Sequence, residues 1–341
     1  MKSSLFVLVL IFAACLPAMA QRGGETVFDL LNLPQSARVA SLGGNQVGLA
    51  GHDLAMLVNN PALLDSALSK QISINYTPYI KDINYAYGAY AHSFGKVGNF
   101  ALGVYHVGYG DFTGRDETGI ITGDFTVSES VLQLAYSRKI STHWHVGAAL
   151  KPVFSRLETY NSWGMAFDAG MFYRSANGLT SAGIVVRNIG RQLDYYHETF
   201  ESIKPDLQIG FSTKLAHAPF RFAITLQDLL TKSLLYTVPD ENKNIAFADD
   251  QNASKDGFFD DVFRRFRFGV EFVPLKNFYV AGGFNPRMRH DLGVESKVST
   301  VGFSWGFGLR IKQFQFAYGS ARYHLAGTTN HFSITANLSS F

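Results

Sequence analysis

The stretch VGFSWGFGLRIK, residues 301–312, alternates strictly between two kinds of side chain. Its even positions are small or charged, and its odd positions are apolar: Val301, Phe303, Trp305, Phe307, Leu309 and Ile311. A period of two is typical of a strand whose two faces meet different surroundings. However, Gly302, Ser304 and Gly306 also have the G-x-S-x-G spacing of a hydrolase nucleophile elbow. The stretch is therefore either one wall of a sheet or an active-site turn.

The same alternation recurs from residue 71 to the end of the chain. Most of these segments are near the 9–11 residues that a tilted strand needs to cross a bilayer. We count about fourteen of them, near residues 71–79, 83–94, 98–109, 128–140, 143–157, 162–173, 180–188, 206–215, 220–228, 264–273, 278–286, 300–311, 314–325 and 329–338.

The pattern predicts an all-β fold, a transmembrane antiparallel β-barrel of about 14 strands over residues 71–341. Because lipid cannot satisfy polar groups, the apolar face must point outward and the face with Gly, Ser, Gln, Lys and Arg must line the lumen. In the opening stretch, the odd positions from Val301 to Ile311 should face lipid, and the even positions from Gly302 to Arg310 should face the lumen. A chain with 29 Phe and 16 Tyr also suits the aromatic girdles of such barrels.

The connections between these strands alternate in length, as expected for short periplasmic turns and longer outer loops. Only the links after the first and fifth strands are shorter than this rule suggests. A soluble β-sandwich also has alternating strands, but it would not favour this asymmetry. The short connections are near 95–98, 141–143, 216–219 and 274–277, and the long ones near 110–127, 189–205, 229–263 and 287–299.

Residues 1–20 have the features of a cleaved secretory signal peptide. Lys2 provides a basic start, an apolar run covers 5–14, and Ala18-Met19-Ala20 offers a cleavage site. An alternative is a lipoprotein acylated on Cys15, the only cysteine of the chain. Export to the outer membrane is the expected localisation. The net charge of +3 is too small to indicate a nucleic-acid partner.

Residues 21–70 lack the strand pattern and are mildly apolar. Gly43-Gly44 and Pro61 interrupt the segment, and Asp53 is placed to cap a short helix over 54–58. A freely disordered tail would be more charged and less apolar. We therefore predict a short, partly helical plug that folds into the barrel lumen.

A search for catalytic or metal-binding residues finds no site with all the residues that its chemistry needs. The elbow interpretation of Ser304 lacks a following helix, and no Asp or Glu occurs from Val301 to the end of the chain. His143 and His145 share a strand face, but a zinc site normally needs at least three protein ligands. We expect no enzyme activity, no cofactor and no metal. An outer-membrane acyl hydrolase would depend on Ser304 alone.

Three N-terminal stretches strongly resemble the PorQ family of the Bacteroidetes type IX secretion system. They are DLLNLPQSARVASLGG (29–44), NNPALL (59–64) and NYTPYIKDINYAYGAYAHSF (75–94). The Asn-Pro-Ala at 60–62 is shared with long-chain fatty-acid transporters and the sister protein PorV. The plug residues that carry the resemblance are Asn32, Pro34, Arg38, Gly43, Gly44, Asn60 and Pro61.

The resemblance implies a FadL-like barrel with an N-terminal hatch that belongs to the cell-surface attachment complex. In that family the barrel anchors the surface protein PorZ beside PorV and the sortase PorU, among outer-membrane lipid and lipopolysaccharide. The outer loop 229–263 would be the docking surface, and its aromatic side chains suit an interface. Those residues are Tyr236, Phe258, Phe259 and Phe263. The alternative is a FadL-like channel for hydrophobic small molecules.

Overall fold

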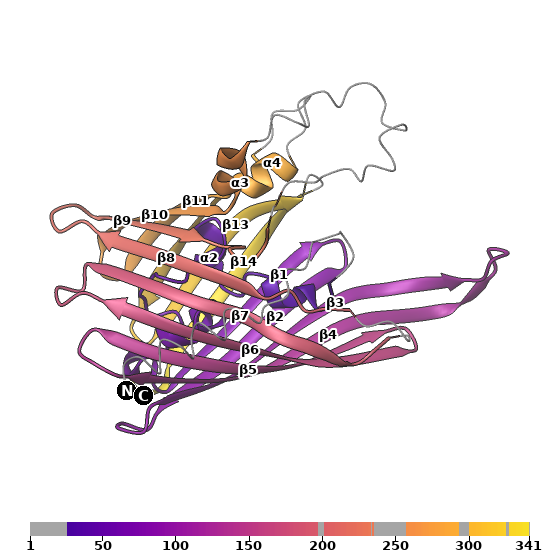
Figure 1. Ribbon diagram of the computed structural model, residues 1–341, viewed down its shortest axis with the longest axis horizontal. Coiled ribbons are helices and arrows are strands. Elements are labelled where there is room, and N and C mark those ends of the chain that lie inside the picture. The colour runs from indigo at the N-terminus through magenta and orange to yellow at the C-terminus, as the bar shows by residue number, and fades with distance from the viewer. Residues whose placement is uncertain are drawn as a thin grey trace.

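In a computed structural model of the chain, fourteen antiparallel strands form a closed barrel (Figure 1). The structure describes residues 26–196, 201–232, 234, 257–292, 300–324 and 327–340. Each strand pairs with its neighbours in sequence, and β1 pairs with β14 to close the barrel. The strands are β1 (Gln71–Ile80), β2 (Ile83–Ser93), β3 (Asn99–Arg115), β4 (Ile121–Lys139), β5 (Trp144–Leu157), β6 (Tyr160–Arg174), β7 (Thr180–Asp194), β8 (Asp206–Lys214), β9 (Phe220–Leu226), β10 (Phe266–Leu275), β11 (Phe278–Phe284), β12 (Phe303–Ile311), β13 (Phe314–His324) and β14 (Gly327–Asn337).

Helical segments lie in the N-terminal part of the chain and in the long connections. Within the described ranges, no helix is long and apolar enough to cross a membrane. The N-terminal segments are η1 (Asp29–Asn32), α2 (Ala37–Ser41), η2 (Leu54–Val58), η3 (Pro61–Leu63) and η4 (Ser66–Leu68). Two more, α3 (Phe258–Arg264) and α4 (Pro286–Asp291), lie close together beyond one rim of the barrel (Figure 1), and η7 (Leu338–Ser340) follows β14.

The two faces of the strands differ as the alternation predicts. In β12 the side chains of Phe303, Trp305 and Phe307 are exposed on the outer surface, whereas Ser304 and Gly306 are buried inside. In β1 the buried positions are polar and the exposed ones apolar. A membrane barrel requires this arrangement, because lipid covers the apolar outer face.

The prediction that Val301 faces lipid was wrong. Val301 is fully buried rather than facing lipid, and Gly302 has φ +85° in the turn before β12. The Asn285 amide donates a hydrogen bond to the Gly302 carbonyl oxygen at 2.7 Å, so this turn is tied to the start of α4. The alternating pattern therefore begins two residues before the strand does.

The barrel has one rim of short turns only and one rim that also carries the three long connections, after β7, β9 and β11. Six short turns, after β2, β4, β6, β8, β10 and β12, share the rim where β1 begins and β14 ends. In a bacterial outer-membrane barrel this rim faces the periplasm. The predicted outer loop at 110–127 is instead mostly strand, because β3 and β4 extend far beyond the rest of the barrel (Figure 1). The link from β13 to β14 is also short, like those after β1 and β5.

Residues 26–70 fill the lumen and are called the hatch from here on. Helix α2 packs against β11 to β14, and η3 packs against β4 to β6 on the other side of the lumen. Apolar hatch residues such as Leu30, Leu54 and Leu57 are fully buried against the inner wall. The hatch therefore forms the core of the barrel. The plug predicted within residues 21–70 is present over the described residues 26–70.

Candidate functional site

Arg38 on α2 joins the hatch to the barrel wall through a buried ion pair. Its guanidinium binds both carboxylate oxygens of Glu271 on β10, at 2.6 and 3.0 Å. Arg221 on β9 binds the same carboxylate at 2.9 Å. Arg38 and Glu271 are buried, so these charges are excluded from water and depend on each other. Burial lowers the pKa of Arg38, but the Glu271 carboxylate outweighs burial and raises it above its ordinary value.

The local sequence fixes Arg38 in this position. Ser36 caps α2 by accepting hydrogen bonds from the amides of Arg38 and Val39, and its hydroxyl donates to Asp53. Asp53 in turn caps η2 by accepting from the Ala55 amide at 3.0 Å. Burial raises the pKa of Asp53, while the Ser36 hydrogen bond and the charge of Arg38 oppose that rise. The two short helices are thus joined through their caps.

A second set of polar contacts holds η1 against β7. The Arg187 guanidinium donates to the Leu31 carbonyl oxygen at 2.8 Å, and the Asn188 amide group donates to Asn32 at 3.0 Å. Beside them, Lys151 and Asp168 form a fully buried ion pair at 2.6 Å. These inward charges on β5, β6 and β7 contact each other and hatch backbone, although Oδ2 of Asp168 and both Nε and Nη1 of Arg187 are buried without a hydrogen-bond partner in the described structure.

Ser304, the serine of the G-x-S-x-G match, also belongs to the contact between hatch and wall. Its hydroxyl donates to the Ser41 carbonyl oxygen and accepts from the Gly43 amide, both at 3.0 Å. Gly43 and Gly44 have φ values of +86° and +108°, a backbone conformation that favours glycine. The chain turns sharply there, directly against the inner wall at Gly283. Both hydrogen bonds of Ser304 are therefore made with hatch backbone.

Asn60 and Pro61 place the end of the hatch against β5, β6 and β7. The Asn60 side chain caps η3 by accepting from the Ala62 amide, and it donates to the carbonyl oxygens of Val47 and Met171. Pro61 occupies the first position of η3, where a missing N–H costs nothing. The Asn-Pro-Ala sequence is thus a cap that links two hatch segments to the wall.

A cavity of about 450 Å³ lies between the hatch and the rim of short turns. Its ionisable lining is strongly unbalanced, with six cationic side chains against the carboxylates of Asp65 and Glu271. Burial lowers the pKa of His52 at its edge, and the neighbouring Arg310 guanidinium lowers it further. The six cations are Arg38, Arg174, Lys214, Arg221, Lys276 and Arg310.

A second cavity, of about 360 Å³, lies on the opposite side of the hatch, toward the longer connections. Hatch residues Asn32, Pro34, Gly44 and Asn45 form its floor, and residues of β10, α4 and β13 line its sides. The hatch segment from Asn32 to Asn45, with α2 at its centre, therefore separates the two cavities.

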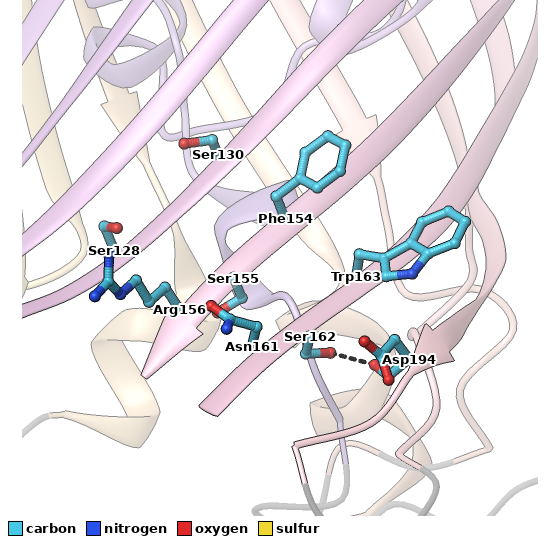
Figure 2. Close-up of a pocket in the computed structure, with 9 residues that line it drawn as sticks. All are labelled: Ser128, Ser130, Phe154, Ser155, Arg156, Asn161, Ser162, Trp163 and Asp194. Carbon is cyan, nitrogen blue, oxygen red and sulfur yellow. Dashed lines mark hydrogen bonds between the residues drawn. The ribbon is translucent and has the colours of Figure 1, made fainter. Parts of the chain in front are cut away.

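A third cavity, of about 400 Å³, lies in the wall itself, near the ends of β5 and β6 that are farthest from the short turns (Figure 2). Phe154 and Trp163 form one side, and the Ser162 hydroxyl donates to the Asp194 carbonyl oxygen at 2.7 Å. None of its lining residues belongs to the hatch. This groove is separate from the space on either side of the hatch.

The expected docking residues lie on α3 as far as they are described. Phe258 and Phe259 are 77% and 86% exposed, and Phe263 is about half exposed. Arg265 fixes the helix to the barrel by binding Asp261 at 2.6 Å and the Thr231 carbonyl oxygen at 2.9 Å. Tyr236 lies outside the described residues. The two exposed rings therefore project from an anchored helix at the rim of longer connections.

Of the six cations of this cavity, Arg38 was named from sequence for the family resemblance and Arg310 as a lumen-facing residue, and the other four were not identified. Arg221, Glu271 and Arg310 each stand in the inward phase of a strand, which could have been recognised by the charge at a lumen-facing position. The contact between Arg38 and Glu271 could not have been recognised from sequence, because it joins residues 233 positions apart. His145 lines the same cavity, whereas His143 lies in the turn before β5.

No family model matches the sequence, and no curated protein matches it either. Solved structures do match in fold. The toluene transporter TodX of Pseudomonas putida has a TM-score of 0.52 and 11% identity, over 91% of this chain and 98% of that one. The TodX deltaS2 mutant, a monoaromatic hydrocarbon channel, has a TM-score of 0.54 and 12% identity over the same shares. A FadL homologue of Pseudomonas aeruginosa has a TM-score of 0.45 and 11% identity, over 89% of this chain and 98% of its own length.

At these identities the likeness is one of fold alone. The similar architecture extends over nine-tenths of the chain and almost all of TodX. The chain is similar in fold to TodX and is a closed barrel of 14 antiparallel strands that holds its own N-terminal hatch.

Proposed function

We propose that this protein is an outer-membrane channel for small molecules, gated by its hatch. The observation that carries the proposal is the pair of cavities on opposite sides of one hatch segment, residues 32–45. A solute that crossed the barrel would have to displace hatch residues between the two cavities, among them α2 and the turn at Gly43 and Gly44. The similar solved structures, a toluene transporter and a monoaromatic hydrocarbon channel, add support for transport as the general activity.

Polar contacts at a few positions orient α2, mainly Arg38 with Glu271, and Ser304 with the backbone at Ser41 and Gly43. Its buried apolar residues, such as Val39, also pack against the inner wall. The strands around it form a closed hydrogen-bonded ladder that is independent of the hatch. The hatch can therefore shift while the barrel stays intact.

Solute flux through the purified protein in liposomes tests this proposal. The wild type should pass labelled glucose or phosphate slowly, and Gly283→Ala, whose added methyl group collides with the hatch at Gly43, should pass them faster. Gly282→Ala adds the same methyl group on the outer face and is the matched control. Uptake of labelled toluene by cells that carry the barrel tests an apolar solute. The proposal fails if neither the wild type nor Gly283→Ala moves any of the three.

A second candidate function is the attachment-complex role, in which the barrel anchors a PorZ-like surface protein near PorU and PorV. The observation that favours it is the exposure of Phe258 and Phe259 on α3, together with the fixing of that helix by Arg265. Large aromatic side chains on a held scaffold are typical of interface hot spots.

Co-purification from native outer membrane separates the two functions. The double variant Phe258→Ser and Phe259→Ser should lose a surface partner that wild type retains. Phe112→Ser, at another exposed ring beyond the barrel, is the control. Deletion of residues 240–258 should likewise release the partner and leave the barrel heat-modifiable on gels. Partner retention in both variants would contradict the docking role.

A further inference from the structure

The cavity toward the short turns has more positive charge than its own carboxylates can neutralise. Glu271 is fully engaged, because Arg38 binds both of its oxygens and Arg221 binds one of them. Asp65 accepts a hydrogen bond from the Ala67 amide at the start of η4. Each carboxylate of the lining is thus already in use within the fold.

The remaining cations have no acidic partner among the residues that the structure describes. Arg310 donates a hydrogen bond to the neutral Gln315 side chain at 3.0 Å. No carboxylate of the described chain forms an ion pair with Arg174, Lys214 or Lys276, and these come from three different places on the wall, β6, β8 and the turn after β10. Several strands therefore contribute uncompensated positive charge to one cavity at this rim of the barrel.

Two further polar groups lie at the wall of this cavity without a partner in the described structure. The Tyr279 hydroxyl on β11 and Nδ1 of His145 on β5 are buried and make no hydrogen bond there. The Arg38 guanidinium lies 5.6 Å from the centre of the Tyr279 ring. Buried polar groups are normally hydrogen-bonded, so these two point to a molecule that would supply the missing contacts.

We infer that this cavity binds a small, water-soluble anion with more than one negative charge, of the polycarboxylate or phosphate class. Arginine and lysine are the side chains that recognise these groups through charge-assisted hydrogen bonds. The cations are spread around the wall, so a multivalent anion would satisfy more of them than a single carboxylate. The strands shield the cavity from the lipid that surrounds the barrel, which favours a soluble ligand over a lipid headgroup.

The binding site goes beyond the proposed function, because an anion can occupy it whether or not any solute crosses the hatch. An anion here would lie beside Arg38 and Arg221, the two cations that hold Glu271. The ligand would therefore lie next to the ion pair of Arg38 with Glu271, which joins the hatch to the wall.

Isothermal titration calorimetry of the full protein in detergent tests the inference, with citrate and inorganic phosphate as probes. Both should bind, and Lys214→Gln with Arg310→Gln should weaken citrate binding at least tenfold, since each lost contact is a charge-assisted hydrogen bond. Neither side chain forms a hydrogen bond or ion pair with the hatch within the described residues, and heat modifiability on gels reports that the barrel is intact. Lys96→Gln, in a short turn outside the cavity, is the matched control and should leave binding unchanged.

Three results would overturn the inference. They are the absence of binding for both probes, equal binding by the double variant and wild type, and binding only of a short-chain lipid such as dihexanoyl phosphatidylglycerol. Transport plays no part in these measurements, so their failure leaves the flux experiment unaffected. Conversely, a protein that binds citrate but passes no solute would contradict the channel and support the anion site.

Discussion

Arg38 is the side chain on which the position of α2 most depends. It is a buried cation in the centre of the lumen, and Glu271 is its only carboxylate partner at ion-pair distance among the described residues. A buried charge without its partner is far more costly than the pair is stabilising. A single substitution on the wall can therefore remove one of the contacts that hold the hatch, the ion pair of Arg38 with Glu271.

Glu271→Gln should loosen the hatch without opening the barrel. Removing one partner of a buried pair costs roughly 3 kcal/mol, which corresponds to an increase of about two orders of magnitude in local opening. Hydrogen–deuterium exchange of residues 36–44, followed by mass spectrometry, measures this directly. Glu158→Gln, in the exposed turn after β5, is the control. Unchanged exchange in Glu271→Gln would show that the pair does not fix α2.

Single residues also show which structural features could be predicted from the sequence. The inward direction of Ser304 followed from the alternation, because its neighbours Phe303 and Trp305 required the outer face. Its contacts with Ser41 and Gly43 could not be predicted, since they join positions more than 250 residues apart. Val301 was placed wrongly, because an apolar residue in a buried turn has the same appearance as one that faces lipid.

At the scale of elements, glycines on the inner wall decide how closely the hatch can approach. A Cβ at Gly283 would lie 2.0 Å from the Gly43 nitrogen, whereas at Gly282 it would meet nothing nearer than 4.0 Å. The two neighbours point to opposite faces of β11. Small residues in the inward phase therefore form a surface shaped to the hatch backbone.

Gly283→Ala should displace the turn at Gly43, and Gly282→Ala should not. Overpacking a filled core typically costs 1–3 kcal/mol. Hydrogen exchange of residues 42–46 should accelerate in Gly283→Ala and match the wild type in Gly282→Ala, and both barrels should stay heat-modifiable. Equal exchange in the two variants would contradict the close packing of hatch and wall.

Most strand bounds were predicted to within a few residues, but β3, β4 and β7 extend six or seven residues past the predicted segments, and the long connections were not predicted. Alternation of side chains identified all fourteen strands, but it stops being visible in polar segments. The extension of β3 to Arg115 and of β4 from Ile121 was therefore taken for a loop. Helices α3 and α4 were missed for another reason, as six- and seven-residue helices are too short to show a helical period.

For the whole molecule, the apolar outer face is the feature that separates a membrane barrel from a soluble sheet. Phe307 lies near the middle of β12 with its side chain exposed. In a bilayer, Phe307→Arg should lower the free energy of unfolding by about 2–4 kcal/mol, because a charge at mid-membrane depth loses its hydration. Urea unfolding in phospholipid vesicles measures this. Phe307→Ala, which removes the ring without adding charge, is the control, and equal losses in the two variants would contradict the lipid-facing assignment.

The central claim is that solutes pass only when the hatch moves, and a reversible lock tests it most directly. The Ala37 amide donates to the Ser333 hydroxyl at 2.9 Å, so Ala37→Cys with Ser333→Cys offers a disulfide between α2 and β14. The pair is engineered into a protein whose only native cysteine is Cys15. Mass spectrometry establishes that the bond has formed.

Solute flux in liposomes is then compared for the oxidised and reduced forms of this double variant. The account predicts that oxidation abolishes flux and that reduction restores it, while each single cysteine variant conducts equally under both conditions. Undiminished flux through the fully oxidised form would contradict the account, because solutes would then cross without movement of α2.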